Sequence, residues 1–382
     1  MYKITILGDV MFQKSMLNFD YKKMFSNIEQ YLSKSNLVIA NLETPIKESV
    51  IGDDIKQYQF VAPRTYVEEL KKIGINMIST ANNHCLDNGK EGIIQTINIL
   101  DNIGLEHIGT YKTKNEKRYI IKNIENKKVA FLANTYGTNA FVNDFYIDNN
   151  DRFHICMLQE QELNNKILRK MYRSKNIFLK VIKKVFFIFH IFQFQKPIYE
   201  RNEKSYLNEI ENDIEKIKLN ENPDYILMMM HDGGQNNNSP IDRTKKRIKY
   251  MKKLGINAII TNHEHMIHKA ELQNDGIITY SLGNFISANG VIEEPFDKMQ
   301  DYSIAINIYF DDNDIKYTFT IFKLTFDKND NCIKVNNLYD LINDEIDTEK
   351  KQKLIIDNKK IVNRVLSSNK DVEVKKEYEI EE

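Results

Sequence analysis

The feature of this sequence that most constrains its fold is a repeated alternation of short apolar runs with amphipathic helical segments. The helical segment 63–74 is typical, because Pro63 stands near its start and Gly74 near its end. Strands with near-continuous apolar residues, separated by helices, indicate a sheet that is covered on both faces, so we predict an α/β fold. The predicted strands are 2–9, 36–43, 75–80, 128–136, 224–234, 256–265 and 276–285.

The C-terminal part of the chain has a different pattern. Two apolar runs, 303–310 and 316–326, follow one another without a helix between them, which predicts an antiparallel meander. We expect one domain over 1–325, interrupted by an insertion at about 155–200. We expect the remainder, 326–382, to form a strand and a charged helical tail.

Composition excludes several classes of protein. Lys+Arg and Asp+Glu both number 54, so the net charge is zero and a nucleic-acid partner is not expected. Cys85, Cys156 and Cys332 are far apart and have neither metal-site nor redox spacing. The chain has no secretory leader pattern at its start and no apolar run of about 18 residues. We therefore expect a cytoplasmic protein without a signal peptide or a membrane span.

Polar side chains follow several of the predicted strands. A lone histidine after a strand is usually a hydrogen-bonded structural residue, but ligand-type residues at this many strand ends favour a metal site. Residues i and i+2 of an extended segment point to the same side, so His263 and His265 can face one centre. Such oxygen and imidazole donors, without a thiolate, suit Mn²⁺, Fe²⁺ or Zn²⁺. The candidates are Asp9, Glu43, Asn83, His84, His231, His263 and His265.

A set of ordered motifs resembles a known family. The match covers roughly 1–145 and 220–290 and is similar to the CapA-type capsule-synthesis proteins, known also from bacterial poly-γ-glutamate synthesis. The domain of that family resembles the calcineurin-like metallophosphoesterases. The resemblance implies a four-layer α/β/β/α sandwich with a dinuclear metal site between two sheets. Its motifs are "GDVMF", "NLETPI", "STANNHCLDNG", "MMMHDGG", "TNHEHMIH" and "YSLGNFIS".

The resemblance also implies roles for single residues. His84 matches the catalytic histidine, which contacts the substrate or protonates the leaving group. Met11 stands where the general phosphoesterase pattern has a histidine, so one metal site has fewer ligands and we expect one or two ions (Mn, Fe or Zn). The implied ligands are Asp9, Glu43 and His265 for one metal, and Glu43, Asn83, His231 and His263 for the other.

Two positions depart from the family pattern beside the implied ligands. Asp232 stands where CapA-type proteins usually have tryptophan, and Glu264 where they usually have proline. Both add a carboxylate, which would orient the ligands or change the substrate that is admitted. Asp87 is expected to serve turn and helix-cap chemistry. The candidates for substrate contact or for support of the ligands are Asn41, Asp232, Glu264, His268 and Asn284.

The insertion and the function leave alternatives open. The aromatic and lysine-rich segment 176–196 suits a helix at a membrane interface, or a helical hairpin packed on its own domain or on a second copy. The favoured function is a metal-dependent hydrolase of phosphoester type, acting on a phosphorylated or polymeric substrate in capsule or cell-surface polymer biosynthesis. The alternatives are a non-catalytic polymer-binding assembly subunit and an enzyme that acts on γ-glutamyl amide bonds.

Overall fold

The computed structural model confirms the mixed α/β class. The aromatic segment 176–196, with its expected membrane or hairpin role, lies outside the described residues apart from three single positions. No helix among the described residues is long and apolar enough to cross a membrane. The structure describes residues 1–56, 59–162, 176, 178, 181, 203–273, 276–293, 299–311 and 314–381.

The first sheet has nine strands and carries both ends of the described chain. Its order is β16-β15-β14-β1-β2-β5-β6, with β13 paired to β1 and β17 paired to β15. The strands β1, β2, β5 and β6 are parallel, while β14, β15 and β16 form the predicted antiparallel meander. The strands are β1 (Tyr2–Val10), β2 (Leu37–Leu42), β5 (Met77–Ser79), β6 (Glu106–Ile108), β13 (Asn284–Ile286), β14 (Tyr302–Phe310), β15 (Ile315–Asp327), β16 (Cys332–Asn337) and β17 (Tyr378–Glu379).

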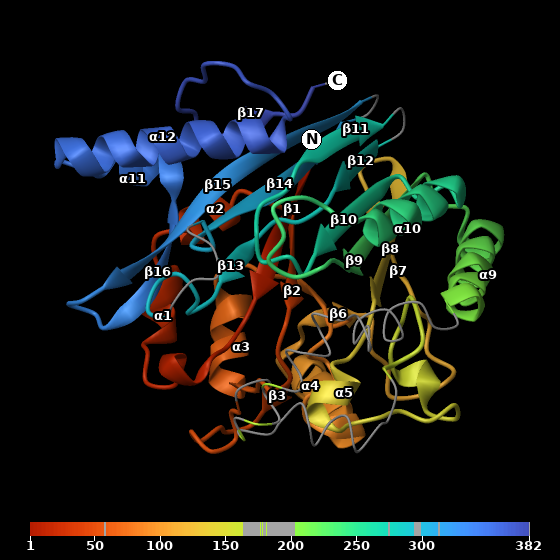
Figure 1. Ribbon diagram of the computed structural model, residues 1–382. Helices are drawn as coiled ribbons and strands as arrows, with labels where there is room; N and C mark the ends of the chain where they lie inside the picture. The colour runs from red at the N-terminus through yellow and green to blue at the C-terminus, as the bar shows by residue number, and fades with distance from the viewer. Residues whose placement is uncertain are drawn as a thin grey trace.

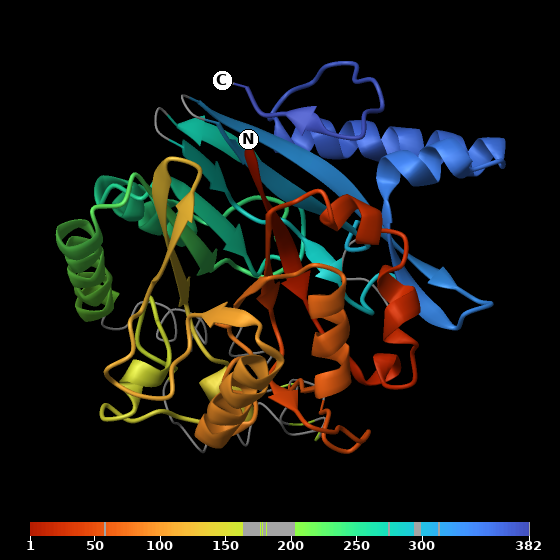
Figure 2. The ribbon, with the colours of Figure 1, turned by 180° about the vertical axis from the view of Figure 1, so that it is seen from behind.

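The second sheet has six strands in the order β11-β12-β10-β9-β8-β7. Its centre, β8, β9, β10 and β12, is parallel (Figures 1 and 2). Its strands are β7 (Ile120–Ile124), β8 (Lys127–Thr135), β9 (Tyr225–His231), β10 (Ala258–Asn262), β11 (Ala270–Gln273) and β12 (Gly276–Thr279). A separate small sheet pairs β3 (Ile46–Lys47) with β4 (Ala62–Pro63).

The predicted strand 276–285 is wrong, because this stretch forms two strands in different sheets. The chain leaves the second sheet after β12 and enters the first sheet at β13, which pairs with β1. Gly283 has φ +78, and a Cβ there would lie 2.7 Å from the Tyr302 carbonyl oxygen. Only glycine makes such a close left-handed turn readily, so the crossover lies there.

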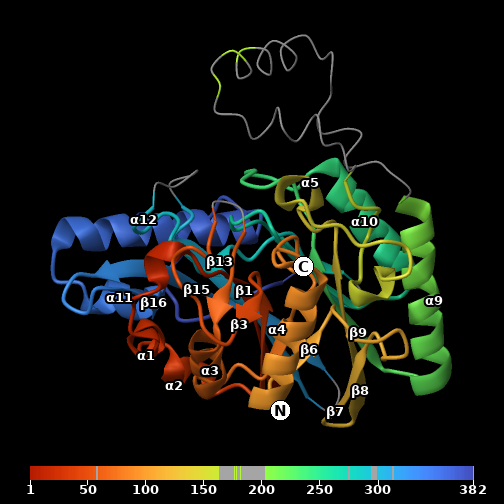
Figure 3. The same cartoon turned by 90° about the horizontal axis from the view of Figure 1, so that it is seen from below.

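Helices cover the outer faces of both sheets. In Figure 3, α9 and α10 lie at one side of the molecule, and α1 and α2 at the opposite side. The helices are α1 (Tyr21–Phe25), α2 (Glu29–Leu32), α3 (Arg64–Lys72), α4 (Gly89–Ile103), α5 (Ala140–Asn143), α9 (Glu203–Glu221), α10 (Asp242–Lys253), α11 (Leu338–Asp344) and α12 (Thr348–Val365). Short 3₁₀ turns occupy η1 (Lys14–Met16) and η2 (Arg152–His154).

The buried side chains fall into clusters that follow the strand alternation. On β2, Ile39 belongs to a cluster that also contains Leu227 of the second sheet, so inward residues of the two sheets share one core. Its neighbour Val38 belongs to the cluster that α1, α2 and α3 cover. Met228 of β9 belongs to a third cluster, with Ile210 of α9 and Ile248 of α10. Both faces of each sheet are therefore buried, as the continuous apolar runs require.

The C-terminal region packs on the same core as the sheets. The strand β15 runs to Asp327 and so crosses the boundary expected at 325. Leu338 of α11 and Ile361 of α12 belong to the cluster that joins the two sheets. The residues after 325 thus extend the first sheet and cover part of it.

Candidate metal centre

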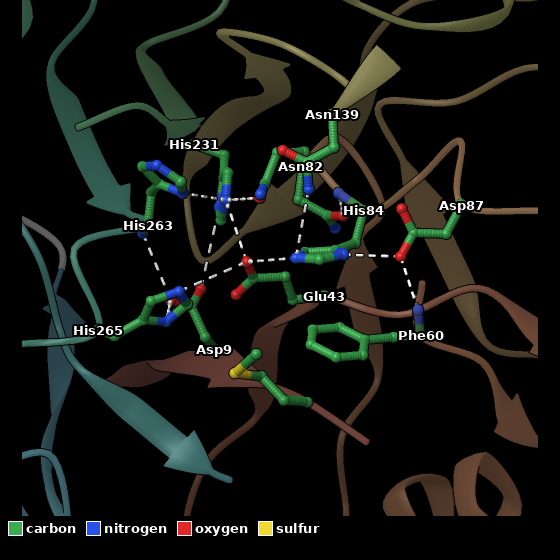
Figure 4. A network of polar contacts seen from close by, with 12 residues as sticks. Asp9, Glu43, Phe60, Asn82, His84, Asp87, Asn139, His231, His263 and His265 are labelled. Carbon is green, nitrogen blue, oxygen red and sulfur yellow. Dashed lines mark hydrogen bonds and ion pairs between the residues drawn. The ribbon is translucent and has the colours of Figure 1, made fainter. Parts of the chain in front are cut away.

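The candidate ligands lie at the carboxyl ends of the central strands of both sheets. Asp9 of β1 pairs in register with Asn41 of β2 and with Asn284 of β13, and the Glu43 backbone N–H donates to the Val10 carbonyl at 2.9 Å. His231 ends β9 beside Asn262 of β10. Parallel strands deliver their end residues to one edge, so the two sheets bring these side chains together (Figure 4).

The first group of donors surrounds His231. Glu43, His231 and His263 each offer one ligand atom, and these atoms all lie within 4.8 Å of one another. The His231 Nε2 atom lies 3.5 Å from Glu43 Oε1, 3.1 Å from His263 Nδ1 and 2.7 Å from Asn83 Oδ1. These are the residues that the family resemblance assigns to one metal.

The second group consists of Asp9, Glu43 and His265, whose ligand atoms also lie within 4.8 Å of one another. His265 Nδ1 is 3.4 Å from Asp9 Oδ2, and its Nε2 is 3.8 Å from Glu43 Oε1. The two groups therefore overlap at Glu43, where the resemblance implies a bridging ligand. All of these side chains are buried.

The chemistry of these donors fits a divalent cation. Glu43 is fully buried, and neither of its carboxylate oxygens has a hydrogen-bond partner among the described residues. A buried carboxylate is costly unless it is paired or coordinates a metal. In addition, His231 Nε2 and His263 Nδ1 are two ring nitrogens only 3.1 Å apart, which requires a proton or a cation between them. These buried acidic and histidine groups could hold a metal.

The pKa values of the buried groups of the centre shift in different directions. Burial would raise the pKa of Glu43, but His265 and His231 outweigh it and lower this pKa to about 2. Burial would lower the pKa of His265, but Glu43 and Asp9 raise it to about 9. The pKa of His263 lies well below its usual range, because of burial and then of the neighbouring His231 and His265. This direction favours the neutral imidazole, whose unprotonated ring nitrogen can accept a hydrogen bond or bind a metal.

The expectation that Asp87 serves only the turn and helix cap is wrong. Its Oδ2 atom lies 2.7 Å from His84 Nδ1, whereas the N-cap of α4 is Asn88 without a side-chain cap bond. Asp87 also accepts the Phe60 backbone N–H at 2.7 Å and the Asn143 amide at 2.5 Å. Asp87 is thereby fixed as the partner of the histidine.

The opposite nitrogen of His84 faces the centre. Its Nε2 atom lies 4.0 Å from Glu43 Oε1 and 3.4 Å from the Asn139 side-chain nitrogen, and the Phe60 ring stacks on the imidazole with centroids 4.3 Å apart (Figure 4). Burial lowers the pKa of His84, but Asp87 and Glu43 outweigh it, so the net shift is upward. His84 can therefore hold a proton at the edge of the donor groups.

Two amide side chains contact the candidate ligands. The Asn41 Nδ2 atom donates to Asp9 Oδ1 at 2.7 Å and lies 3.1 Å from His231 Nδ1, so it joins donors of the two sheets. Asn284 Oδ1 lies 2.9 Å from His265 Nδ1. Both residues therefore contact candidate ligands. Such contacts fix the orientation of a ligating imidazole.

Asn82 and Asn139 were missed by the sequence reasoning. Asn82 donates to the Leu42 carbonyl at 2.7 Å and accepts the His84 backbone N–H at 3.1 Å, which ties the loops after β2 and β5 together. Asn139 follows β8, and its position after a predicted strand was the available signal. Tyr136, also after β8, places its ring 4.6 Å from that of His263.

The remaining candidates lie beside the centre. Asp232 accepts from Arg243 at 3.0 Å and from Arg247 at 2.9 Å. Glu264 accepts backbone N–H groups of the loop 233–237, and His268 Nε2 contacts the Asn237 carbonyl at 2.7 Å. These three side chains thus face neighbouring protein groups.

Four other residues that the sequence singles out were not assigned to the centre. Met11 is buried, with 3% of its surface exposed. Cys85 is also buried, and burial raises the pKa of its thiol. His107 lies 3.1 Å from Asp101, and His154 contacts the Tyr111 carbonyl at 2.6 Å, both outside the donor groups.

Comparison with known proteins identifies relatives. A family described as "Bacterial capsule synthesis protein PGA_cap" matches residues 3–289. The capsule biosynthesis protein CapA of Bacillus anthracis is 24% identical over 299 residues, which are 75% of this chain and 60% of the relative. The PGA biosynthesis protein CapA of Bacillus subtilis (strain 168) is 21% identical over 291 residues, which are 75% of this chain and 63% of the relative. The chain thus spans about three fifths of the length of these curated relatives.

A solved structure also resembles the chain weakly. The protein described as "GAP50 the anchor in the inner membrane complex of Plasmodium" gives a TM-score of 0.35 at 10% identity, over 84% of each chain. A likeness of this size carries no argument about fold or function.

Proposed function

The chain belongs to the bacterial capsule synthesis protein family PGA_cap, and we propose that it is a metal-dependent hydrolase of phosphoester type in the biosynthesis of a capsule or other cell-surface polymer. The observation that carries this proposal is Glu43, whose buried carboxylate has no hydrogen-bond partner among the described residues and belongs to both donor groups. A carboxylate shared between two such groups is typical of paired metal ions, which catalyse displacement at phosphorus.

The proposed fold is the four-layer α/β/β/α sandwich of the metallophosphoesterases. It is supported by the distribution of the buried clusters. One cluster contains residues of both sheets, a second joins the first sheet to α1, α2 and α3, and a third joins the second sheet to α9 and α10.

The donor groups would hold the metal, and His84 would move a proton. Asp9, Glu43 and His265 would hold one ion, and Glu43, Asn83, His231 and His263 another. When bound, a divalent ion supplies Lewis acidity toward a phosphoryl oxygen. Asp87 holds His84 Nδ1, so the opposite nitrogen, Nε2, would donate a proton to the leaving oxygen. Hydrolysis also needs one water molecule, which would attack the phosphorus opposite the leaving oxygen and form the new P–O bond. Burial of the surrounding side chains would limit access of other water.

The proposed substrate is a phosphorylated precursor or a polymer of the cell surface, with the chain itself in the cytoplasm. The printed names of the relatives, which refer to capsule and to PGA biosynthesis, support this substrate class. An amide of a γ-glutamyl chain is the second substrate class that we propose. The same proton from His84 Nε2 would serve a leaving nitrogen.

A different function, that of a polymer-binding assembly subunit without catalysis, is favoured by one observation. Met11 is 3% exposed and stands where the phosphoesterase pattern has an imidazole. The donor group of Asp9, Glu43 and His265 therefore lacks a fourth protein ligand of that kind. A subunit that only binds polymer would tolerate this loss.

Elemental analysis of the protein, purified in metal-free buffer and then loaded with Mn²⁺, tests the proposal. The wild type should carry close to two metal ions and hydrolyse a generic phosphodiester, and His263→Ala should carry less metal and lose turnover. His107→Ala, outside the centre, is the matched control and should behave as the wild type does. Metal without turnover on any phosphoester would favour the binding subunit. No metal after loading would exclude the hydrolase.

A further inference from the structure

The turn that carries His263 and His265 has an unusual backbone. Both residues adopt positive φ angles, 111° at His263 and 56° at His265. Residues other than glycine rarely adopt such angles, and they persist only where the surroundings hold them. Contacts with the surrounding protein must therefore fix the backbone of this turn. Its conformation matters for the centre because His263 belongs to one donor group and His265 to the other.

Glu264, between the two histidines, makes the contacts that hold the turn. Its side chain is buried, with 1% of the residue exposed. Its Oε1 accepts the Gly234 backbone N–H at 2.6 Å, and its Oε2 accepts the Asn237 backbone N–H at 3.1 Å. The Glu264 carbonyl in turn accepts the Asn236 N–H at 3.0 Å. Hydrogen bonds from N–H groups to a carboxylate are among the stronger ones in proteins.

The loop that Glu264 contacts is shaped to receive its carboxylate. A Cβ at Gly233 would lie 2.7 Å from Glu264 Oε1 and 2.8 Å from its Cδ, so a larger residue would push the side chain away. This loop begins next to His231, and the Asp232 N–H donates to the Asn262 carbonyl at 3.1 Å. The carboxylate thus joins the loop after β9, which follows the candidate ligand His231, to the turn after β10, which carries His263 and His265.

Glu264 itself is not placed as a ligand. Both of its oxygens are engaged by backbone N–H groups of the loop, and neither donor group includes it. We propose that Glu264 is a positioning residue, whose carboxylate fixes the His263–His265 turn so that each imidazole reaches its own donor group. Its connection to catalysis rests on the proposed metal-dependent function, whereas its effect on the two imidazoles does not.

Glu264→Gln and Gly233→Ala test this proposal by different routes. The first keeps the size of the side chain but replaces one acceptor by a donor that faces a backbone N–H. Gly233→Ala keeps Glu264 itself unchanged, but the added methyl group displaces its carboxylate from the loop. Asp224→Asn is the matched control, because Asp224 Oδ2 accepts the Lys128 N–H at 2.7 Å at the opposite end of β9.

Two readouts should be measured on the full-length chain. In metal-free protein labelled with ¹⁵N-histidine, both test variants should shift the imidazole resonances of His263 and His265 and leave those of His107 and His154 unchanged. Titration with Co²⁺ should show about 10-fold to 100-fold weaker binding in both variants and an altered visible spectrum. Asp224→Asn should match the wild type in both readouts.

The outcomes separate this inference from the proposed function. If Glu264→Gln and Gly233→Ala only lower the unfolding temperature, and the imidazole resonances and the Co²⁺ affinity stay as in the wild type, the positioning role is overturned. If the wild type binds no metal, the proposed hydrolase fails, and the imidazole resonances of the metal-free protein still decide the role of Glu264.

Discussion

His84 and Asp87 form a buried pair in which the imidazole Nδ1 lies 2.7 Å from the carboxylate Oδ2. The pair lies in the turn that connects β5 to α4, three residues apart, so a local backbone feature orients the group that faces the candidate metals. A carboxylate in this position fixes the tautomer of the ring and favours its protonated form.

Asp87→Asn should lower turnover and leave the metal content unchanged. The amide still accepts the Phe60 N–H but no longer favours the protonated imidazole, so kcat for an alkyl phosphodiester should fall by roughly 100-fold. A 4-nitrophenyl ester needs little protonation of its leaving group and should lose much less. Asp101→Asn, beside His107, is the control for a histidine partner outside the centre. Equal losses on both esters would contradict a general-acid role for His84.

Asn41→Leu should weaken metal binding and also destabilise the protein. The substitution keeps the volume but leaves Asp9 Oδ1 and His231 Nδ1 without the amide that contacts both. Loss of such an orienting contact typically lowers metal affinity by about 10-fold to 100-fold, and an unsatisfied buried acceptor costs about 1–3 kcal/mol. Isothermal titration with Mn²⁺ and urea unfolding measure the two effects. Asn76→Leu, which removes a contact to the Val38 N–H far from the centre, should lower stability alone.

The positions of the candidate ligands at strand ends could be predicted because they follow from periodicity. Asp9, Glu43 and His231 each close an apolar run, and parallel strands bring such ends to one edge. Asn139 also follows a predicted strand, but its contact with His84 depends on the path of the loop between β8 and α5, which the strand pattern does not define. The crossover at Gly283 was hidden because 276–285 shows no break that marks two strands, and the change of sheet depends on one backbone angle.

The departures from the family pattern could be noticed in the sequence, but the partners of the two carboxylates could not be predicted. Asp232 and Glu264 were expected to add carboxylates beside the ligands, either to orient them or to change the admitted substrate, and both carboxylates contact neighbouring groups of the protein. Asp232 contacts Arg247 of α10, and Glu264 contacts N–H groups of the loop 233–237. Both contacts depend on how these segments pack against each other in the folded protein. Tertiary packing of this kind leaves no periodic signal in one sequence.

Arg247→Met should destabilise the protein strongly. Arg247 is fully buried and donates to Asp232 at 2.9 Å, to Glu203 at 2.5 Å and to Gln159 at 2.5 Å. A buried ion pair that loses one partner entirely costs about 3–5 kcal/mol, and here Arg243, 3.0 Å from Asp232, still offsets part of that charge, so we expect a loss of up to about 3 kcal/mol. Urea unfolding at constant pH measures this loss.

The matched control for Arg247→Met is Lys245→Met on the same helix. Lys245 is 3.4 Å from the exposed Asp242, and an exposed pair of this kind contributes less than about 1 kcal/mol. Similar losses in the two variants would show that Asp232 does not depend on Arg247 for its compensation.

Acid should destabilise the protein through His268, which is 1% exposed. Its Nε2 contacts the Asn237 carbonyl at 2.7 Å, and its Nδ1 has no hydrogen-bond partner among the described residues. Burial lowers the pKa of His268, and Arg364 adds to this, while the Asn237 carbonyl and Glu264 oppose it. The folded protein therefore takes up this proton less readily than the unfolded chain does.

The sign of the effect follows from linkage. A histidine with a lowered pKa costs no stability well above the unfolded value of about 6.5, and stability falls as the pH drops below that value until the folded pKa is reached. The slope is at most about 1.4 kcal/mol per pH unit for one proton. His268→Gln, whose amide can still donate to the Asn237 carbonyl, should remove this part of the pH dependence. Urea unfolding of both metal-free proteins between pH 7.5 and 5 measures it, because the other histidines contribute equally to both. Parallel curves for the wild type and the variant would show that His268 takes up its proton as readily in the folded protein as in the unfolded chain.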